Sequence, residues 1–247
     1  MEATSAPQRR ISVGDVVNET FSIYGNQFGP LIGSAIVVFV VVGILAGLLA
    51  TGGVILVLLA SIVQLVGRLL YVGFVVKLVE DVRDGRRDSS IGDLFSVAAP
   101  AILPLIGFSI LAGIGIAIGL ILIIVPGLIL LTFWSVGAPA IVAERVGVIE
   151  AFGRSWNLVK GNGWSVFGVL VVVTLIWLAI GFILVAIANP IGNGAIVVAN
   201  VIAGALTAPL FALAVSVMFF DLGGGRVAEA PAANATPPPP PSAPPSA

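Results

Sequence analysis

The chain has 247 residues, a net charge of −1 and a mean hydropathy of +1.18, with 59% hydrophobic and only 9% charged residues. Soluble domains carry about 25% charged residues, so this composition indicates a membrane protein. The absence of Cys and His excludes disulfides, thiolate or imidazole metal sites and nucleophiles activated by a His base, so we expect no metal, no cofactor and no enzymatic activity.

An amphipathic segment follows a polar N-terminus. Residues 1–10 are expected to be disordered, and they lack the apolar run that a cleavable signal peptide has directly after its basic segment. From Ile11 onward, apolar residues recur at helical spacing, while Asp15 and Glu19 fall on the opposite face. This segment, 11–28, is too polar to span a bilayer, so we predict a helix that lies in the membrane interface.

Six apolar runs follow this segment and predict six transmembrane helices. The first contains 20 residues without a charge, enough to cross about 30 Å of hydrocarbon at about 1.5 Å per residue. The expected spans are residues 31–50, 54–76, 101–124, 128–143, 165–188 and 195–220. Short turns near Gly52, Pro126 and Asn193 would join them into antiparallel pairs, and Pro139 would kink the short fourth span. We therefore expect an all-α, polytopic integral membrane protein.

The distribution of charge predicts the orientation of this protein. Apart from Arg68, its Lys and Arg residues precede the first span, lie between spans two and three or four and five, or follow the sixth. The turns near Gly52, Pro126 and Asn193 contain no charged residue. By the positive-inside rule, the N- and C-termini and the interfacial helices are expected on the cytoplasmic side of a bacterial plasma (inner) membrane.

Three amphipathic segments each precede a pair of spans: VGDVVNETFSIYGNQF, SIGDLFSVAAP and GVIEAFGRSWNLVKGNGW. The expected membrane domain, 11–221, therefore divides into candidate repeats 11–80, 90–143 and 147–220. True duplication and independent surface helices at the start of each hairpin both remain open. The repeats would be parallel, unlike the inverted repeats of many ion-coupled transporters. The Pro-rich tail, 222–247, is expected to be disordered.

The third amphipathic segment contains the candidate lipid contacts. Glu150 and Arg154 are spaced for an i,i+4 ion pair on a helix. Arg154 and Lys160 are expected to face water, with Arg145 nearby and Trp156 at headgroup depth. We predict that these cations contact anionic lipid phosphates, at about 1 kcal/mol for each basic group.

Arg68 is the ionised residue that lies well inside an apolar run. An intramembrane charge is costly, so it is a candidate functional site. Ser61, Gln64, Arg68 and Tyr71 share a predicted helical face, which could line a polar groove for a lipid phosphate or a small solute. Alternatively, Arg68 lies about two turns from the cytoplasmic end of its span, near enough for its side chain to snorkel to the headgroups.

Small and polar residues inside the spans predict helix contacts. Gly43 with Gly47 and Gly115 with Gly119 would let backbones approach closely, and we expect them to pack within the bundle. Asn200 is expected to bridge neighbouring helices. The predicted spans contain no Asp or Glu, which disfavours proton-coupled or cation-coupled transport.

The run that starts at Pro126, PGLILLTFWSVGAPAIVAERVGVIEAFGRSWNLVKGNGWSVFG, resembles the membrane domain that accompanies some bacterial glycerophosphoryl diester phosphodiesterases, and its stand-alone relatives. The residues that carry the resemblance are Pro126, Gly127, Pro139, Ala140, Glu144, Glu150, Ala151, Arg154, Ser155, Trp156 and Gly161. The resemblance implies a six-helix bacterial plasma-membrane protein. It does not imply phosphodiesterase activity, which in such relatives belongs to a separate soluble barrel with paired His and acidic residues.

Two functional hypotheses follow. The first is a non-enzymatic multi-pass membrane protein, a scaffold or lipid-interacting component whose partners are membrane lipids, anionic ones among them. The second is a permease-like conduit for a lipid or small solute that uses the face of Ser61, Gln64 and Arg68. No nucleic-acid partner is expected, and a protein partner or a second copy of the chain is left open.

Overall fold

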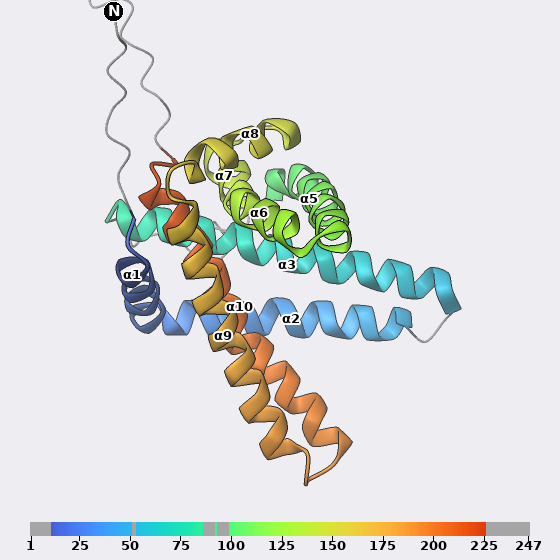
Figure 1. Cartoon of the computed structure of the whole chain (residues 1–247). Coiled ribbons are helices and arrows are strands. Elements are labelled where there is room, and N and C mark those ends of the chain that lie inside the picture. Colours follow the sequence, from blue (N-terminus) through green and yellow to red (C-terminus); the bar gives the residue numbers. More distant parts are fainter. Residues whose placement is uncertain (1–10, 51–52, 86–91, 93–98, 226–247) are drawn as a thin grey trace, which may run out of the picture.

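The computed structural model of the chain describes residues 11–50, 53–85, 92 and 99–225, and its regular elements are all helical (Figure 1). The elements are α1 (Val13–Asn26), α2 (Phe28–Ala50), α3 (Gly53–Arg83), the 3-10 turn η1 (Ala99–Ala101), α5 (Ile102–Leu122), α6 (Ile124–Trp134), α7 (Gly137–Glu144), α8 (Val148–Val159), α9 (Gly163–Ala188) and α10 (Asn193–Asp221). The N-terminal residues 1–10 and the tail from 226 lie outside the described residues.

Six helical segments of this structure are long and apolar enough to cross a membrane. They are residues 28–49, 53–83, 99–122, 124–144, 163–188 and 198–221. The prediction of an all-α protein with six transmembrane helices is therefore confirmed. The remaining helices, α1 and α8, are the two amphipathic ones expected at the membrane surface.

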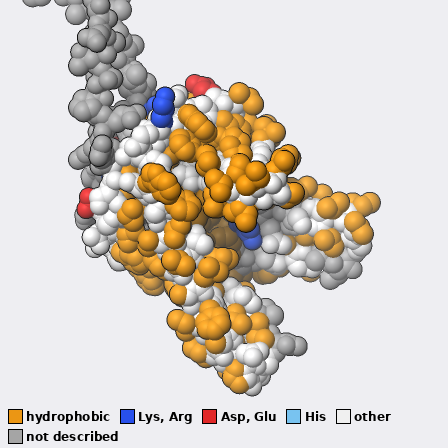
Figure 2. Space-filling view, viewed as in Figure 1, with side chains coloured by type: hydrophobic (Ala, Val, Ile, Leu, Met, Phe, Trp, Pro, Cys, Tyr) orange, Lys and Arg blue, Asp and Glu red, His pale blue; other side chains and the backbone are white. Residues whose placement is uncertain are grey.

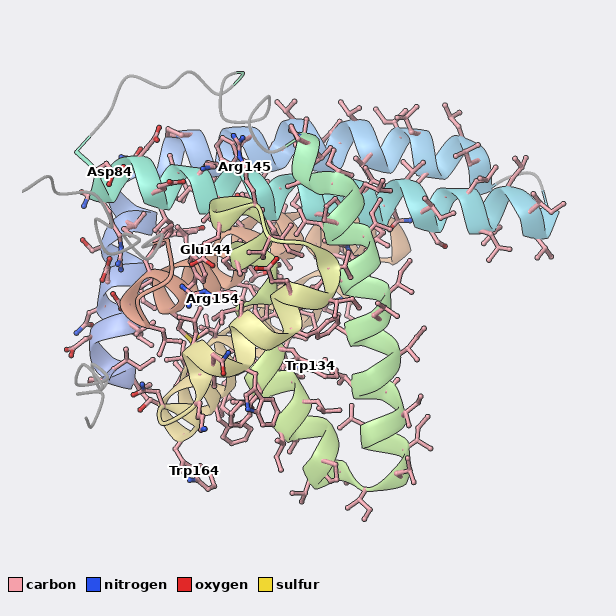
Figure 3. The ribbon with its side chains drawn as sticks, turned by 90° about the horizontal axis from the view of Figure 1, so that it is seen from above. Asp84, Trp134, Glu144, Arg145, Arg154 and Trp164 are labelled. Atoms are coloured by element: carbon pink, nitrogen blue, oxygen red, sulfur yellow. The ribbon has the colours of Figure 1, made fainter. Side chains whose placement is uncertain are left out.

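The spans pack as three hairpins, α2 with α3, α5 with α6, and α9 with α10. Helices α6 and α7 together form the fourth span. The hairpins diverge: α2–α3 and α9–α10 point in different directions in Figure 1, and Figure 3 shows α5 and α6 leaving the line of α2 and α3. The segment 90–99, where a third surface helix was predicted, lies almost wholly outside the described residues. The threefold duplication therefore stays a prediction.

The hydrophobic core lies where the hairpins converge on α1, α7 and α8. Its largest fully buried side chains include Val16, Leu31, Tyr71, Phe74, Leu105, Ile141, Leu213 and Phe219. The far ends of the hairpins expose apolar side chains instead, such as Val54 (78% exposed), Ile121 (84%) and Ile191 (74%). Such surfaces suit contact with lipid tails, since hydrocarbon imposes no cost on an exposed apolar side chain.

One boundary differs from the sequence-based prediction, because Pro126 lies at the start of a helix and not in the turn before it. The turn between α5 and α6 is at Ile123, whose φ of −157° and ψ of 134° are extended. Pro126 lies in the first turn of α6, where its missing N–H costs no hydrogen bond. The kink predicted at Pro139 is present as a break in the fourth span between α6 and α7, with Pro139 in the first turn of α7.

Glycines set how closely the helices of a hairpin approach. A Cβ added to Gly67 of α3 would lie 2.5 Å from Cγ2 of Val42 in α2. A Cβ added to Gly119 of α5 would lie 2.9 Å from Cα of Gly127 in α6, so Gly119 packs closely against Gly127 within the α5–α6 hairpin. Gly43 and Gly47 are different, because among the described residues no atom beyond their own helix backbone lies within 4 Å of an added Cβ. The expectation that they pack within the bundle is wrong for these two glycines.

We predict that Gly67→Ala lowers the free energy of unfolding by about 1–3 kcal/mol, because the methyl group would push Val42 and the α2–α3 hairpin apart. The matched control is Gly43→Ala, where the space is open and Ala has the better helix propensity by about 1 kcal/mol. Thermal unfolding in detergent measures both variants. Equal losses of stability would contradict the close contact of Gly67 with Val42.

Candidate functional site

Charged side chains gather at one end of the molecule. The ion pairs of the described residues join Lys77 to Glu80, Arg83 to Glu19 and Asp221, and Arg154 to Glu144. These residues lie on α1, α8 and the last turns of α3, α7 and α10, a region we call the charged end. Figure 2 shows hydrophobic side chains over most of one face, with charged side chains toward its upper left edge.

Arg83 links three helices at the charged end. Its Nη2 donates to Oε1 of Glu19 at 2.6 Å and to Oδ1 of Asp221 at 2.8 Å. The guanidinium carbon also lies 5.5 Å from the centre of the Phe220 ring, within range of a cation–π contact. An open cavity of about 410 Å³ adjoins this group and is lined by Ile11, Ser12, Asp15, Val16, Glu19, Arg83 and Asp221. Arg83 is therefore a structural link between α1, α3 and α10.

Arg154 and Glu144 form a bidentate ion pair between α8 and the end of α7 (Figure 3). Nε and Nη2 of Arg154 donate to the two carboxylate oxygens of Glu144, each at 2.7 Å. These hydrogen bonds raise the pKa of the Arg154 guanidinium. Oε1 of Glu144 also accepts the backbone N–H of Gly225 at 2.9 Å. The pair therefore ties α7 and α8 to the chain that follows α10.

The predicted pair between Glu150 and Arg154 is wrong, because Arg154 uses its guanidinium on Glu144. The side chain of Arg154 is only 32% exposed and turns back under α8, whereas Glu150 is exposed. Arg145 makes this return possible, since its left-handed backbone (φ 56°) reverses the chain between the two helices. Local helical spacing could not reveal a pair ten residues apart across a turn. The sequence signal for this pair was that both Glu144 and Arg154 match residues that recur in the membrane domain the chain resembles.

The other residues of that resemblance also serve packing. Ala151 and Ser155 of α8 are fully buried, and Oγ of Ser155 donates to the carbonyl of Phe133 at 2.7 Å. The ring of Trp156 lies 4.2 Å from the ring of Phe133, centre to centre. These contacts fix α8 against α6. The motif residues therefore build the corner where the chain turns from the fourth span onto the surface helix.

We predict that Glu144→Ala and Arg154→Ala each destabilise the protein and that their coupling energy is about 1–2 kcal/mol in a double-mutant cycle. The partial exposure of Arg154 keeps the value in the lower part of the range for charged pairs. Glu150→Ala is the matched control and should be nearly neutral. Chemical unfolding in detergent gives the energies. Coupling of Arg154 with Glu150 in place of Glu144 would contradict the observed pair.

Two cations near α8 have no ion-pair partner among the described residues. Arg145 and Lys160 are exposed and flank α8 on either side. Exposed apolar side chains accompany them: Ile149 (75%), Trp156 (40%) and Trp164 (88%). We call these five residues the α8 surface. Figure 3 shows Trp164 projecting from the edge of the ribbon. Sequence reasoning missed Trp164, although a Trp directly before an apolar span is typical of a membrane interface.

The predicted polar face of α3 divides into two parts. Ser61, Gln64 and Arg68 are exposed, and Oγ of Ser61 donates to the carbonyl of Val57 at 3.0 Å. Tyr71 is instead buried, with its hydroxyl donating to the carbonyl of Leu31 at 3.0 Å. Tyr71 therefore belongs to the core and to the α2–α3 contact.

Asn200 also differs from its expected role. Its Nδ2 donates to the carbonyl of Ile196 at 3.0 Å, one turn earlier in α10. The amide is thus satisfied within its own helix and does not bridge two helices through this bond. This leaves Arg68, Gln64 and Ser61 as the polar group of interest inside the spans.

The six apolar spans and the gathered charges define a multi-pass membrane protein. Residues 50–219 match the family described as Uncharacterised protein family (UPF0259), and the chain belongs to this family. It is 32% identical over 98 residues to a UPF0259 membrane protein of Pectobacterium carotovorum, covering 40% of this chain and 39% of the relative. It is also 32% identical over 124 residues to one of Photorhabdus laumondii, covering 50% and 46%.

The alignments thus span less than half the length of these two relatives. No solved structure matches the chain. The names of the two relatives state membrane location and carry no activity.

Proposed function

We propose that this chain is a non-enzymatic, lipid-interacting scaffold of the bacterial plasma membrane, with the charged end and both termini in the cytoplasm. The observation that carries the proposal is the α8 surface, where two unpaired cations lie beside exposed Trp and Ile side chains. Basic groups attract anionic headgroups, while Trp and Ile favour the boundary between headgroups and acyl chains.

The local structure supports a role for the α8 surface. Leu158 and Val159 face the core, which leaves the opposite side of the helix outward. Arg145 adopts a left-handed conformation that glycine adopts more easily. Arg145 is a long, exposed cation without an ion-pair partner among the described residues, and it stands at a strained backbone position. This combination is consistent with a functional side chain. We leave Arg154 out of the proposed lipid contacts, because its guanidinium is paired with the carboxylate of Glu144.

The cytoplasmic orientation is supported by the charge distribution. The charged end includes Lys77, Arg83, Arg154 and Lys160, whereas the turns at Ile123 and Gly192 at the far ends of two hairpins contain no charged residue. Retention of basic residues on the cytoplasmic side is the general rule for membrane proteins. The family membership and apolar helices establish a membrane protein, and the orientation is part of our proposal.

A non-enzymatic role is supported by the inventory and use of polar groups. The chain has no His or Cys, and the carboxylates of Glu19, Glu144 and Asp221 are engaged by Arg83 or Arg154. We further propose that the chain is related to the membrane domain that accompanies glycerophosphoryl diester phosphodiesterases. This relationship concerns the membrane-spanning part alone and not the enzyme. The permease-like conduit ranks second, because Ser61, Gln64 and Arg68 line neither of the two cavities described for this structure.

We predict that Lys160→Gln lowers the affinity for phosphatidylglycerol about fivefold, and that Arg145→Gln lowers it about fivefold again. Lys77→Gln is the matched control, because it removes the same charge from a cation that Glu80 already pairs at 2.6 Å. Native mass spectrometry of the protein with added lipid measures retention. An equal loss with Lys77→Gln, or no loss with the α8 variants, would refute the α8 surface as the lipid contact.

A further inference from the structure

We propose that Arg68, with Gln64 beside it, binds the phosphate of an anionic phospholipid inside the membrane. This site is separate from the α8 surface and does not depend on it. The shared ligand chemistry is a phosphate ester anion, and its source is a lipid that enters sideways from the bilayer. Four observations carry the inference: the depth of Arg68, its lack of a partner, its polar neighbours and its apolar surroundings.

The contact between Gly67 and Val42 gives the depth of Arg68. Because these two residues lie side by side in the antiparallel α2–α3 hairpin, Arg68 is level with Val41. Val41 lies ten residues after Leu31 and nine before Ala50 in the charge-free run of α2. At about 1.5 Å per residue, Arg68 is about 15 Å from either end of that run.

This depth is within one turn of the sequence-based expectation, which placed Arg68 about two turns from the cytoplasmic end of its span. The next charged residue of α3, Lys77, follows nine residues after Arg68, about 13.5 Å along the helix axis. A guanidinium at the middle of a span of about 30 Å is farther from either headgroup layer than its side chain extends. Snorkelling along α3 is therefore a poor explanation for its position, and the charge needs a partner at that depth.

The described part of the chain supplies no such partner. No ion pair or hydrogen bond of Arg68 joins it to another described residue, and its side chain is exposed. A second copy could not neutralise it from an equivalent depth, since the parts of the six spans that lie outside the charged end contain no Asp or Glu. An uncompensated charge in hydrocarbon is costly, so a mobile anion of the membrane is the fitting partner.

Two polar side chains lie on the same side of α3 as Arg68. Gln64 is one turn away, at the i−4 position, and is exposed without a side-chain hydrogen bond to a described residue. Ser61 is the next polar position along this face and is also exposed. A guanidinium offers paired donors to phosphate oxygens, and the Gln64 amide adds a further donor about one turn away.

The surroundings favour a lipid over a free phosphate. Apolar side chains near the level of Arg68 on α2 are exposed, such as Val41 (52%), Ile44 (59%) and Leu45 (49%). Acyl chains can cover such apolar surface, whereas a free phosphate would lose its hydration to reach it.

The test uses the full chain in detergent with phosphatidylglycerol or phosphatidylcholine added, measured by native mass spectrometry. We expect Arg68→Leu to weaken retention of phosphatidylglycerol about tenfold, the loss expected for one charged hydrogen-bonding group. Arg68→Lys should keep most of the affinity, and retention of phosphatidylcholine should not change. Arg68→Leu is also made in the double variant Arg145→Gln, Lys160→Gln, so that the α8 surface does not contribute to the retention that is compared.

A second measurement locates the bound lipid. Because the chain has no Cys, Ser61→Cys introduces a single thiol beside the site. Phosphatidylglycerol should slow its modification by an anionic thiol reagent, and the additional change Arg68→Leu should remove this protection. Equal retention by the wild type and Arg68→Leu would overturn the proposal, as would protection that persists without Arg68.

Two further outcomes separate the alternatives. Displacement of phosphatidylglycerol by inorganic phosphate would overturn the assignment to a lipid. Arg68→Leu should unfold at the same or a higher temperature than the wild type in lipid-free detergent, because an unpaired intramembrane charge has been removed. Its unfolding at a lower temperature would show a structural role and would also overturn the proposal. A loss of lipid retention with Lys160→Gln tests the α8 surface, whereas a loss with Arg68→Leu tests the Arg68 site, so the two proposals can fail separately.

Discussion

Two guanidinium groups, those of Arg83 and Arg154, hold the three hairpins and the surface helices together at one end of the molecule. Arg83 joins α3 to α1 and α10, and Arg154 joins α8 to α7 and, through Glu144, to the chain after α10. Such pairs gain strength near apolar surroundings, where water screens charge less than in solution. The hydrophobic core lies beside the same end, so ionic and apolar contacts stabilise one common junction.

This arrangement separates a rigid junction from three arms that contact mainly their own partners. Buried residues of α3 and α10 concentrate toward the charged end, whereas the arms expose Leu, Ile and Val over much of their length. In a bilayer, that exposed surface faces lipid. A protein built in this way presents a large surface to lipids and a compact set of charged contacts at one membrane boundary, which fits a lipid-interacting scaffold.

The spans and surface helices were predictable because apolar runs and helical periodicity are local properties of the sequence. The partner of Arg154 was not, because Glu144 is brought to it by a left-handed turn at Arg145. The register of α2 against α3 also depends on tertiary contacts, such as the packing of Gly67 on Val42 and the hydrogen bond of Tyr71 to Leu31. The turn at Ile123 was misplaced to Pro126, because Pro126 was taken as part of the turn although it lies in the first turn of the next helix.

The most direct test of a molecule with its charged end in the cytoplasm is thiol labelling of single-Cys variants, since the chain has no Cys. Ile191→Cys lies at the turn between α9 and α10, and Asn157→Cys lies on the exposed side of α8. In intact spheroplasts, a membrane-impermeant maleimide should label Ile191→Cys, and it should label Asn157→Cys only after lysis. Labelling of Asn157→Cys in intact spheroplasts, with Ile191→Cys protected, would contradict this topology.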